Sequence, residues 1–127
     1  MFRKRLFSFL VLIIIIFSIC NTSCVNNNKE VLYGCDSTNV TYSKTIVSVL
    51  TNNCYQCHSN ANSSSIGGGI NLEGYSNVRN WVQPNNTNGS ILYTNVKSGR
   101  MPKNLPKISD CDIAKISNWI KNGAPNN

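Results

Sequence analysis

The residues with the clearest chemical potential form one short run, Cys54-Tyr55-Gln56-Cys57-His58. The spacing C-x-x-C-H is the attachment signature of a c-type haem. Two thiols three positions apart lie on one side of a helical turn, where they match the two vinyl groups on one edge of the porphyrin. His58 follows directly, so its imidazole is placed to bind the iron from the proximal side. The run predicts one covalent haem c, held by Cys54, Cys57 and His58.

Two other uses of this run compete with haem attachment. A thioredoxin-like dithiol needs a βαβ context, and the sequence around Cys54 shows no strand pattern of that kind. A zinc site needs about four nitrogen or sulfur ligands. His58 is the only histidine of the chain, and there is no second C-x-x-C. Both alternatives are therefore weaker than haem.

The N-terminus is typical of an exported protein. A basic start at residues 1–5 precedes an apolar run from Leu6 to Ile19. This run is shorter than the roughly 20 residues that a membrane span needs, and its length suits an export signal. The net charge of +7 includes three cations of this segment, so its removal leaves about +4. No basic stripe with interleaved aromatic residues accompanies that charge, and we expect no nucleic-acid partner.

The end of the signal resembles a bacterial lipobox. Ser23 is a small residue before Cys24, which would receive the lipid, although Asn21 is unusual at its position. We therefore expect a lipoprotein-type signal peptide over 1–23, a lipid anchor on Cys24 and a polar tether over 24–40. The alternative is ordinary cleavage, in which Cys20 and Cys24 have no role.

Counting cysteines predicts a disulfide. Of the six cysteines, two belong to the haem motif, Cys20 leaves with the signal and Cys24 carries lipid, so Cys35 and Cys111 remain. Export favours oxidation of such a pair. A Cys35–Cys111 disulfide would close most of the domain into one loop and add about 3–5 kcal/mol of stability. Two free thiols are the alternative.

Helical patterns surround the haem motif. An apolar pattern that begins near Tyr42, with Ser43 as a candidate cap, predicts a helix that runs into Cys54. Weaker patterns predict short helices over 72–81 and 91–96, the second capped by Gly89-Ser90. The glycine-rich stretch within 59–69 predicts a loop whose backbone lies close to the cofactor. Three aromatic residues are expected to fill the core around a flat cofactor: Tyr75, Trp81 and Tyr93.

The second iron ligand is expected from the basic loop over 97–107. Met101 is the only methionine left after the signal is removed, and Pro102 restricts the backbone that presents it. A thioether held in this way suits the sixth position of the iron. The alternative is a surface methionine beside a five-coordinate or otherwise ligated iron.

The last helix has the clearest local signals. Ser109 is an N-cap, Asp112 completes a capping-box pattern, and Gly123 is the expected residue after the helix end. Isoleucines at helical spacing, with Trp119 beside them, predict a buried face: Ile113, Ile116 and Ile120.

Taken together, the parts resemble a small class I cytochrome c domain of an exported bacterial lipoprotein. The matching parts are the helix that enters the C-x-x-C-H run, the Met101-Pro102 loop and the closing run over 105–124, in that order. The resemblance covers roughly 42–124. It implies an all-α domain over 41–124, with a tail over 125–127, whose first and last helices cross beside one haem. It also implies that His58 and Met101 are the axial ligands and that Trp119 packs near the haem edge.

The expected function is one-electron transfer in the periplasm or at the outer-membrane surface, with redox proteins as partners. No acid–base pair, activated nucleophile or distal histidine marks an active centre, so we do not expect an enzyme. Two alternatives stay open: a haem-based sensor or gas-binding module, and a haem-bearing accessory subunit of a larger membrane complex.

Overall fold

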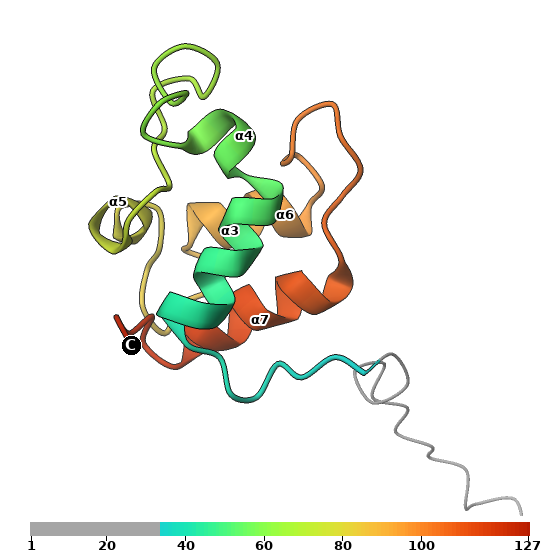
Figure 1. Cartoon of the computed structure of the whole chain (residues 1–127). Coiled ribbons are helices and arrows are strands. Elements are labelled where there is room, and N and C mark those ends of the chain that lie inside the picture. The colour runs from blue at the N-terminus through green and yellow to red at the C-terminus, as the bar shows by residue number, and fades with distance from the viewer. Residues whose placement is uncertain (1–33) are drawn as a thin grey trace, which may run out of the picture.

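A computed structural model of the chain describes residues 34–127, and this part is helical, without a β-strand (Figure 1). The all-α prediction is therefore confirmed for 34–127. The predicted signal peptide, Cys24 and the first part of the tether lie outside the described residues. Between residues 34 and 127, no helix is long and apolar enough to cross a membrane. The elements in order are η1 (Tyr42–Ile46), α3 (Val47–Asn53), α4 (Tyr55–His58), α5 (Tyr75–Arg79), α6 (Ile91–Lys97) and α7 (Asp110–Lys121).

The first helix begins as a π-helical turn, η1, and continues into α3. Ser43, the predicted cap, lies inside η1, and the residue at the N-cap, Thr41, makes no side-chain cap bond. The cap comes instead from the far end of the chain. Asn127 accepts from the backbone N–H of Tyr42 through its side-chain oxygen and from that of Ser43 through its backbone oxygen, both at 2.8 Å. Sequence-local reasoning could not find this cap, because 85 residues separate Tyr42 from Asn127.

The last residues are part of the fold, whereas the sequence suggested a tail over 125–127. Gly123 turns the chain with φ +88° after α7. The backbone oxygen of Ala124 then accepts from the hydroxyl of Tyr75, and that of Pro125 accepts from the indole N–H of Trp119, both at 2.9 Å. The C-terminal segment therefore joins η1, α5 and α7.

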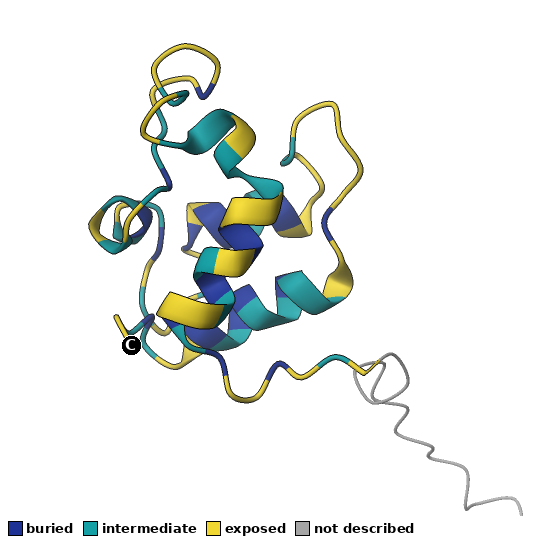
Figure 2. Ribbon diagram, viewed as in Figure 1, coloured by how far each residue is buried: buried dark blue, intermediate teal, exposed yellow. Residues whose placement is uncertain are grey.

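Helix α7 follows its local signals. The hydroxyl of Ser109 accepts from the backbone N–H of Asp112 at 3.0 Å, which satisfies one N–H of the first turn. Both η1 and α6 contact α7, and its predicted apolar face is buried against them (Figure 2). The largest fully buried side chains of the described part are Trp119, Ile46, Leu50, Ile116, Ile120, Val78 and Val96.

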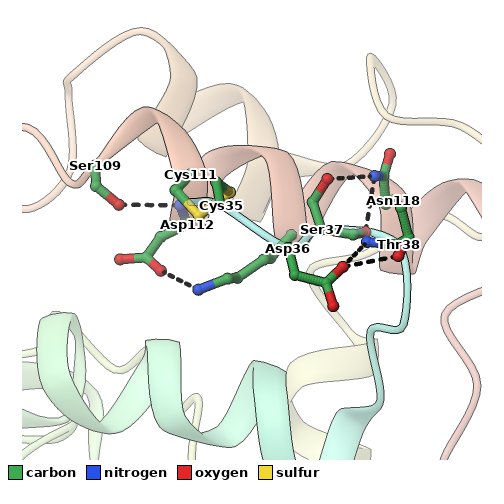
Figure 3. Close-up of a disulfide and its surroundings, with 9 residues drawn as sticks. Cys35, Asp36, Ser37, Thr38, Ser109, Cys111, Asp112 and Asn118 are labelled. Carbon is green, nitrogen blue, oxygen red and sulfur yellow. Dashed lines mark hydrogen bonds and ion pairs between the residues drawn. A yellow bond between two sulfur atoms is a disulfide. The ribbon is translucent and has the colours of Figure 1, made fainter. Parts of the chain in front are cut away.

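Residues 35–40 pack against α7, although the sequence assigned them to the tether. The amide of Asn118 on α7 donates to the backbone oxygen of Ser37 at 2.9 Å and to its hydroxyl at 3.1 Å (Figure 3). Ser37 and Val40 are buried. The predicted Cys35–Cys111 disulfide is present, with 5.7 Å between the Cα atoms. We call residues 35–40 the strap. The strap therefore belongs to the domain.

Candidate cofactor pocket

One pocket of about 310 Å³ brings together four of the five residues that the sequence assigned to a cofactor. This volume lies at the lower end of the range for small-molecule and cofactor sites, about 300–1,000 Å³. Its walls come from the end of α3, from α4, from the loop over 59–74, from Trp81 after α5, from α6 and from the loop over 98–109. The chemically relevant lining residues are Cys54, Cys57, His58 and Met101.

The two cysteines lie on one turn, which begins where the first helix is interrupted at Cys54. Cys54 ends α3 with φ −124° and precedes α4, and its backbone oxygen accepts from the N–H groups of Cys57 and His58. Both cysteines are free thiols in the wall of the pocket. Burial raises the pKa of the Cys54 thiol to about 11, so this thiol stays protonated at neutral pH.

The imidazole of His58 is oriented by a backbone carbonyl. Its Nδ1 lies 2.9 Å from the oxygen of Ile70 and donates its hydrogen there. This bond fixes the tautomer and leaves Nε2 as the nitrogen with a free lone pair. The backbone oxygen of His58 accepts in turn from the N–H of Leu72 at 2.8 Å. The same short segment therefore holds both the ring and the backbone of His58.

The glycine run allows the loop to reach His58. Gly67 is buried, and a Cβ at this position would overlap the backbone oxygen of Cys57 and lie 2.7 Å from the Cα of Ser63. Gly68 and Gly69 then turn the chain with φ values of +63° and +79°. Gly67 and Gly68 line the pocket, so the predicted glycine backbone does lie against the cofactor pocket. Ile70, whose oxygen orients His58, was missed by the sequence analysis, and the run of three glycines before it was the available signal.

Met101 lines the pocket from the loop between α6 and α7. Its backbone N–H donates to the backbone oxygen of Asn95 on α6 at 3.2 Å. Asn95 also lines the pocket. Met101 and His58 are therefore lining residues of one pocket, and helix α6 anchors the loop that carries Met101.

Trp119 is not brought to this pocket. Its side chain is fully buried beside Tyr42, with ring centroids 5.7 Å apart, and it is not among the lining residues. The tryptophan that lines the pocket is Trp81, which the sequence analysis placed among the residues around the cofactor. The indole N–H of Trp119 donates to the Pro125 oxygen, and its ring lies beside Tyr42 at the start of the first helix, whereas Cys54 follows the end of that helix.

The pocket is lined by three exposed apolar side chains as well as by exposed polar ones such as Gln56 and Lys103. Three large hydrophobic residues of the described part are conspicuously exposed: Ile66 at 63%, Ile91 at 50% and Leu105 at 54%. All three line the pocket, and they come from three different segments. Isolated apolar residues on a surface need no explanation, but a group at the mouth of one pocket marks a ligand or partner site.

The competing uses of the C-x-x-C-H run find no support in this geometry. Within 34–127, no three side chains of His, Cys, Asp or Glu gather where they could hold a metal ion, so a zinc ligand set is missing there. The same range lacks the strands of a thioredoxin-like βαβ unit.

Comparison of the chain with protein-family models, with curated proteins and with solved structures found no match.

Proposed function

We propose that the chain is an exported one-electron carrier with a single haem c attached through Cys54 and Cys57. The observation that carries this proposal is the shared pocket: Cys54 and Cys57, both free thiols, line it together with Met101 and with His58, whose Nδ1 is bound to the Ile70 oxygen. When bound, the haem iron supplies a reversible one-electron couple.

The residues present fit such a group. A porphyrin is a large flat apolar body, and the lining includes Leu72, Trp81, Leu92 and Val96 besides the exposed residues of the rim. A planar group in this pocket would cover part of Ile66, Ile91 and Leu105 and so remove apolar surface from water. The two thiols would form the covalent attachment, and His58 and Met101 would be the axial ligands.

The chain's own groups set the properties of the couple. The Ile70 oxygen accepts the His58 Nδ1–H, which raises the basicity of the imidazole and holds its orientation. The neutral thioether of Met101 favours the reduced state and raises the potential. The apolar part of the lining would keep water from one side of a bound haem, which would reduce the solvent that has to reorganise when an electron is gained or lost.

The proposal also covers the arrangement of the helices, the location of the protein and its partners. The first and last helices cross beside the haem, and contacts of η1 and α6 with α7 are compatible with that arrangement. The N-terminal signal and a lipidated Cys24 place the domain in the periplasm or at the outer-membrane surface. Its partners are redox proteins.

The direct test is a pair of double variants expressed with a c-type haem attachment system. Cys54→Ala with Cys57→Ala should remove all haem that survives acid–organic extraction. Cys35→Ser with Cys111→Ser is the matched control, because it also removes two cysteines but leaves the pocket intact, and it should keep the haem. A redox titration of the wild type should follow a one-electron curve. Haem that stays attached without Cys54 and Cys57 would contradict the proposal.

A further inference from the structure

The loop over 59–74 carries one wall of the pocket and is closed at its base. It supplies five lining residues: Ile66, Gly67, Gly68, Ile70 and Leu72. Hydrogen bonds join its first residues to its last ones, so the chain leaves α4 and returns to it. We call residues 58–60 and 70–73 the loop base.

Side chains hold much of the loop base. The backbone contributes the bond from the Leu72 N–H to the His58 oxygen, at 2.8 Å. Three further bonds use a side chain. The first is the contact of His58 Nδ1 with the Ile70 oxygen described above. The amide of Asn71 donates to the side-chain oxygen of Asn60 at 2.7 Å, and the carboxylate of Glu73 accepts from the backbone N–H of Asn60 at 2.8 Å.

Glu73 is well fixed for this role. Its own N–H donates to the side-chain oxygen of Asn71 at 2.9 Å, and its side chain is half-buried. Neither of the ion pairs among residues 34–127 includes Glu73, so its carboxylate binds a backbone N–H rather than a cation. Hydrogen bonds to an ionised acceptor are about twice as strong as neutral ones. Glu73 is therefore a strong contact of the loop base.

The charge of Glu73 also lies near the C-x-x-C-H turn. It is the only acidic residue of the sequence between Asp36 and Asp110. Burial raises the pKa of the Tyr55 phenol, and the Glu73 carboxylate raises it further. Tyr55 directly follows Cys54 in the turn. A negative charge close to an iron favours the oxidised state, which is the more positive one.

We propose that Glu73 is a positioning residue for the His58 imidazole: by binding the Asn60 N–H, it holds the loop base closed and keeps the Ile70 oxygen on Nδ1. Glu73 does not touch the imidazole itself. It acts through Asn60 at one end of the loop and through its own backbone at the other. The three glycines before Ile70 resist opening little, because glycine leaves the backbone free. This inference rests on the proposed haem attachment, in which His58 is an iron ligand.

Two variants separate the hydrogen bond of Glu73 from its charge. Glu73→Ala removes both. Glu73→Gln is the matched control, because its side-chain oxygen still accepts from the Asn60 N–H although the charge is gone. Both variants should have a higher midpoint potential than the wild type. The potential of Glu73→Ala should be the higher of the two, because displacement of the Ile70 oxygen also lowers the basicity of His58.

Amide hydrogen exchange in the reduced, haem-loaded protein measures the loop base without using the potential. The Leu72 N–H is the reporter, because it is bonded to the His58 oxygen and not to the Glu73 side chain. Its exchange should become about tenfold faster in Glu73→Ala, as expected for the loss of a bond to a charged group, and less so in Glu73→Gln. The Leu92 N–H, which donates to the Trp81 oxygen at 3.0 Å, is the reference and should not change.

The orientation of the imidazole has its own readout. In a ferric haem, the NMR shifts of the ring methyl groups depend on the plane of the axial imidazole. Glu73→Ala should change the pattern of these shifts, and Glu73→Gln should keep that of the wild type. Asn71→Ala is a second variant, for the case that Glu73→Ala does not fold. It removes the side-chain bonds to Asn60 and to the Glu73 N–H but keeps the charge, and it should also speed the exchange at Leu72.

Three results would overturn the inference while leaving the proposed function intact. One is a haem-methyl pattern in Glu73→Ala that equals that of the wild type. Another is exchange that rises equally at Leu72 and Leu92, because this would mean a general loss of stability. The third is unchanged exchange at Leu72 in both Glu73→Ala and Asn71→Ala. A wild type without covalent haem in a competent host would refute the proposed function instead.

Discussion

The Nδ1 atom of His58 and the backbone oxygen of Ile70 lie 2.9 Å apart, although 12 residues separate them. This hydrogen bond links the C-x-x-C-H turn to the far end of the glycine-rich loop. A ligating histidine is commonly oriented by such an outer partner, which also tunes its basicity. The glycine run is therefore more than a linker, because it places the group that orients the imidazole of His58.

The first prediction concerns Gly67. Gly67→Ala should shift the loop, because the new Cβ would collide with the Cys57 oxygen and press on Ser63. We expect a loss of about 1–3 kcal/mol of stability, as for other overpacked sites. Displacement of the Ile70 oxygen should also lower the basicity of His58 and raise the midpoint potential. Denaturation and a redox titration measure the two effects.

Gly68→Asn is the control for this change. Gly68 has a positive φ of +63° and open space around its Cβ position, and asparagine tolerates that conformation. The control should keep the potential of the wild type. An equal shift in potential for both variants would show that the close approach at Gly67 does not position His58.

The second prediction concerns Met101. Met101→Ala should leave the haem attached but open its sixth position, lower the potential and admit external ligands such as imidazole. The far-red methionine–iron charge-transfer band of the ferric protein should disappear. Leu105→Ala is the control, because Leu105 lines the same pocket from the same loop but has no sulfur. An unchanged spectrum and potential in Met101→Ala would rule Met101 out as the sixth ligand and favour the sensor interpretation.

The third prediction is that the disulfide stabilises the fold but does not affect the pocket. Removing the disulfide with Cys35→Ser and Cys111→Ser should cost about 3–5 kcal/mol, because the bond closes a loop with 76 residues of separation. The haem spectrum should not change, since neither cysteine nor the strap lines the pocket. Asn118→Ala keeps the disulfide but loses the bonds to Ser37, and it should cost only about 1 kcal/mol. Thermal unfolding and the visible spectrum test both statements.

Features that depend on residues close together in the sequence could be predicted, whereas contacts between distant residues could not. The α7 cap was predictable because Ser109 and Asp112 are three residues apart. The disulfide followed from counting, without knowledge of the fold. The Asn127 cap and the attachment of the strap to Asn118 were missed because their partners are 85 and 81 residues away.

The residues of the pocket also divide into those that local sequence predicts and those that depend on the whole fold. The C-x-x-C-H spacing identified three lining residues, and elimination identified Met101. Trp119 was assigned to the cofactor by resemblance alone, and its buried position beside Tyr42 is set by packing and by the Pro125 oxygen. Such placement depends on the whole core, which a pattern in a single helix does not contain.

The last prediction concerns Tyr42, whose buried hydroxyl has no hydrogen-bond partner among the described residues. A buried hydroxyl without a partner costs free energy, so Tyr42→Phe should raise the free energy of unfolding by about 1 kcal/mol or more. Tyr75 packs edge-on against Tyr42, with centroids 5.0 Å apart, but its hydroxyl donates to the Ala124 oxygen. Tyr75→Phe is thus the matched control and should lower stability by about 1 kcal/mol.

The pH dependence of the free energy of unfolding is a second, independent test of the buried Tyr42 hydroxyl. Burial raises the pKa of Tyr42 from 10.0 to about 12, so folding favours the protonated phenol. This contribution to stability is complete below pH 10 and is lost as the pH rises towards 12. The wild type should therefore lose more stability than Tyr42→Phe between pH 9 and pH 11, measured by urea denaturation. A Tyr42→Phe variant that is less stable than the wild type at pH 7 would mean that a buried water satisfies the hydroxyl.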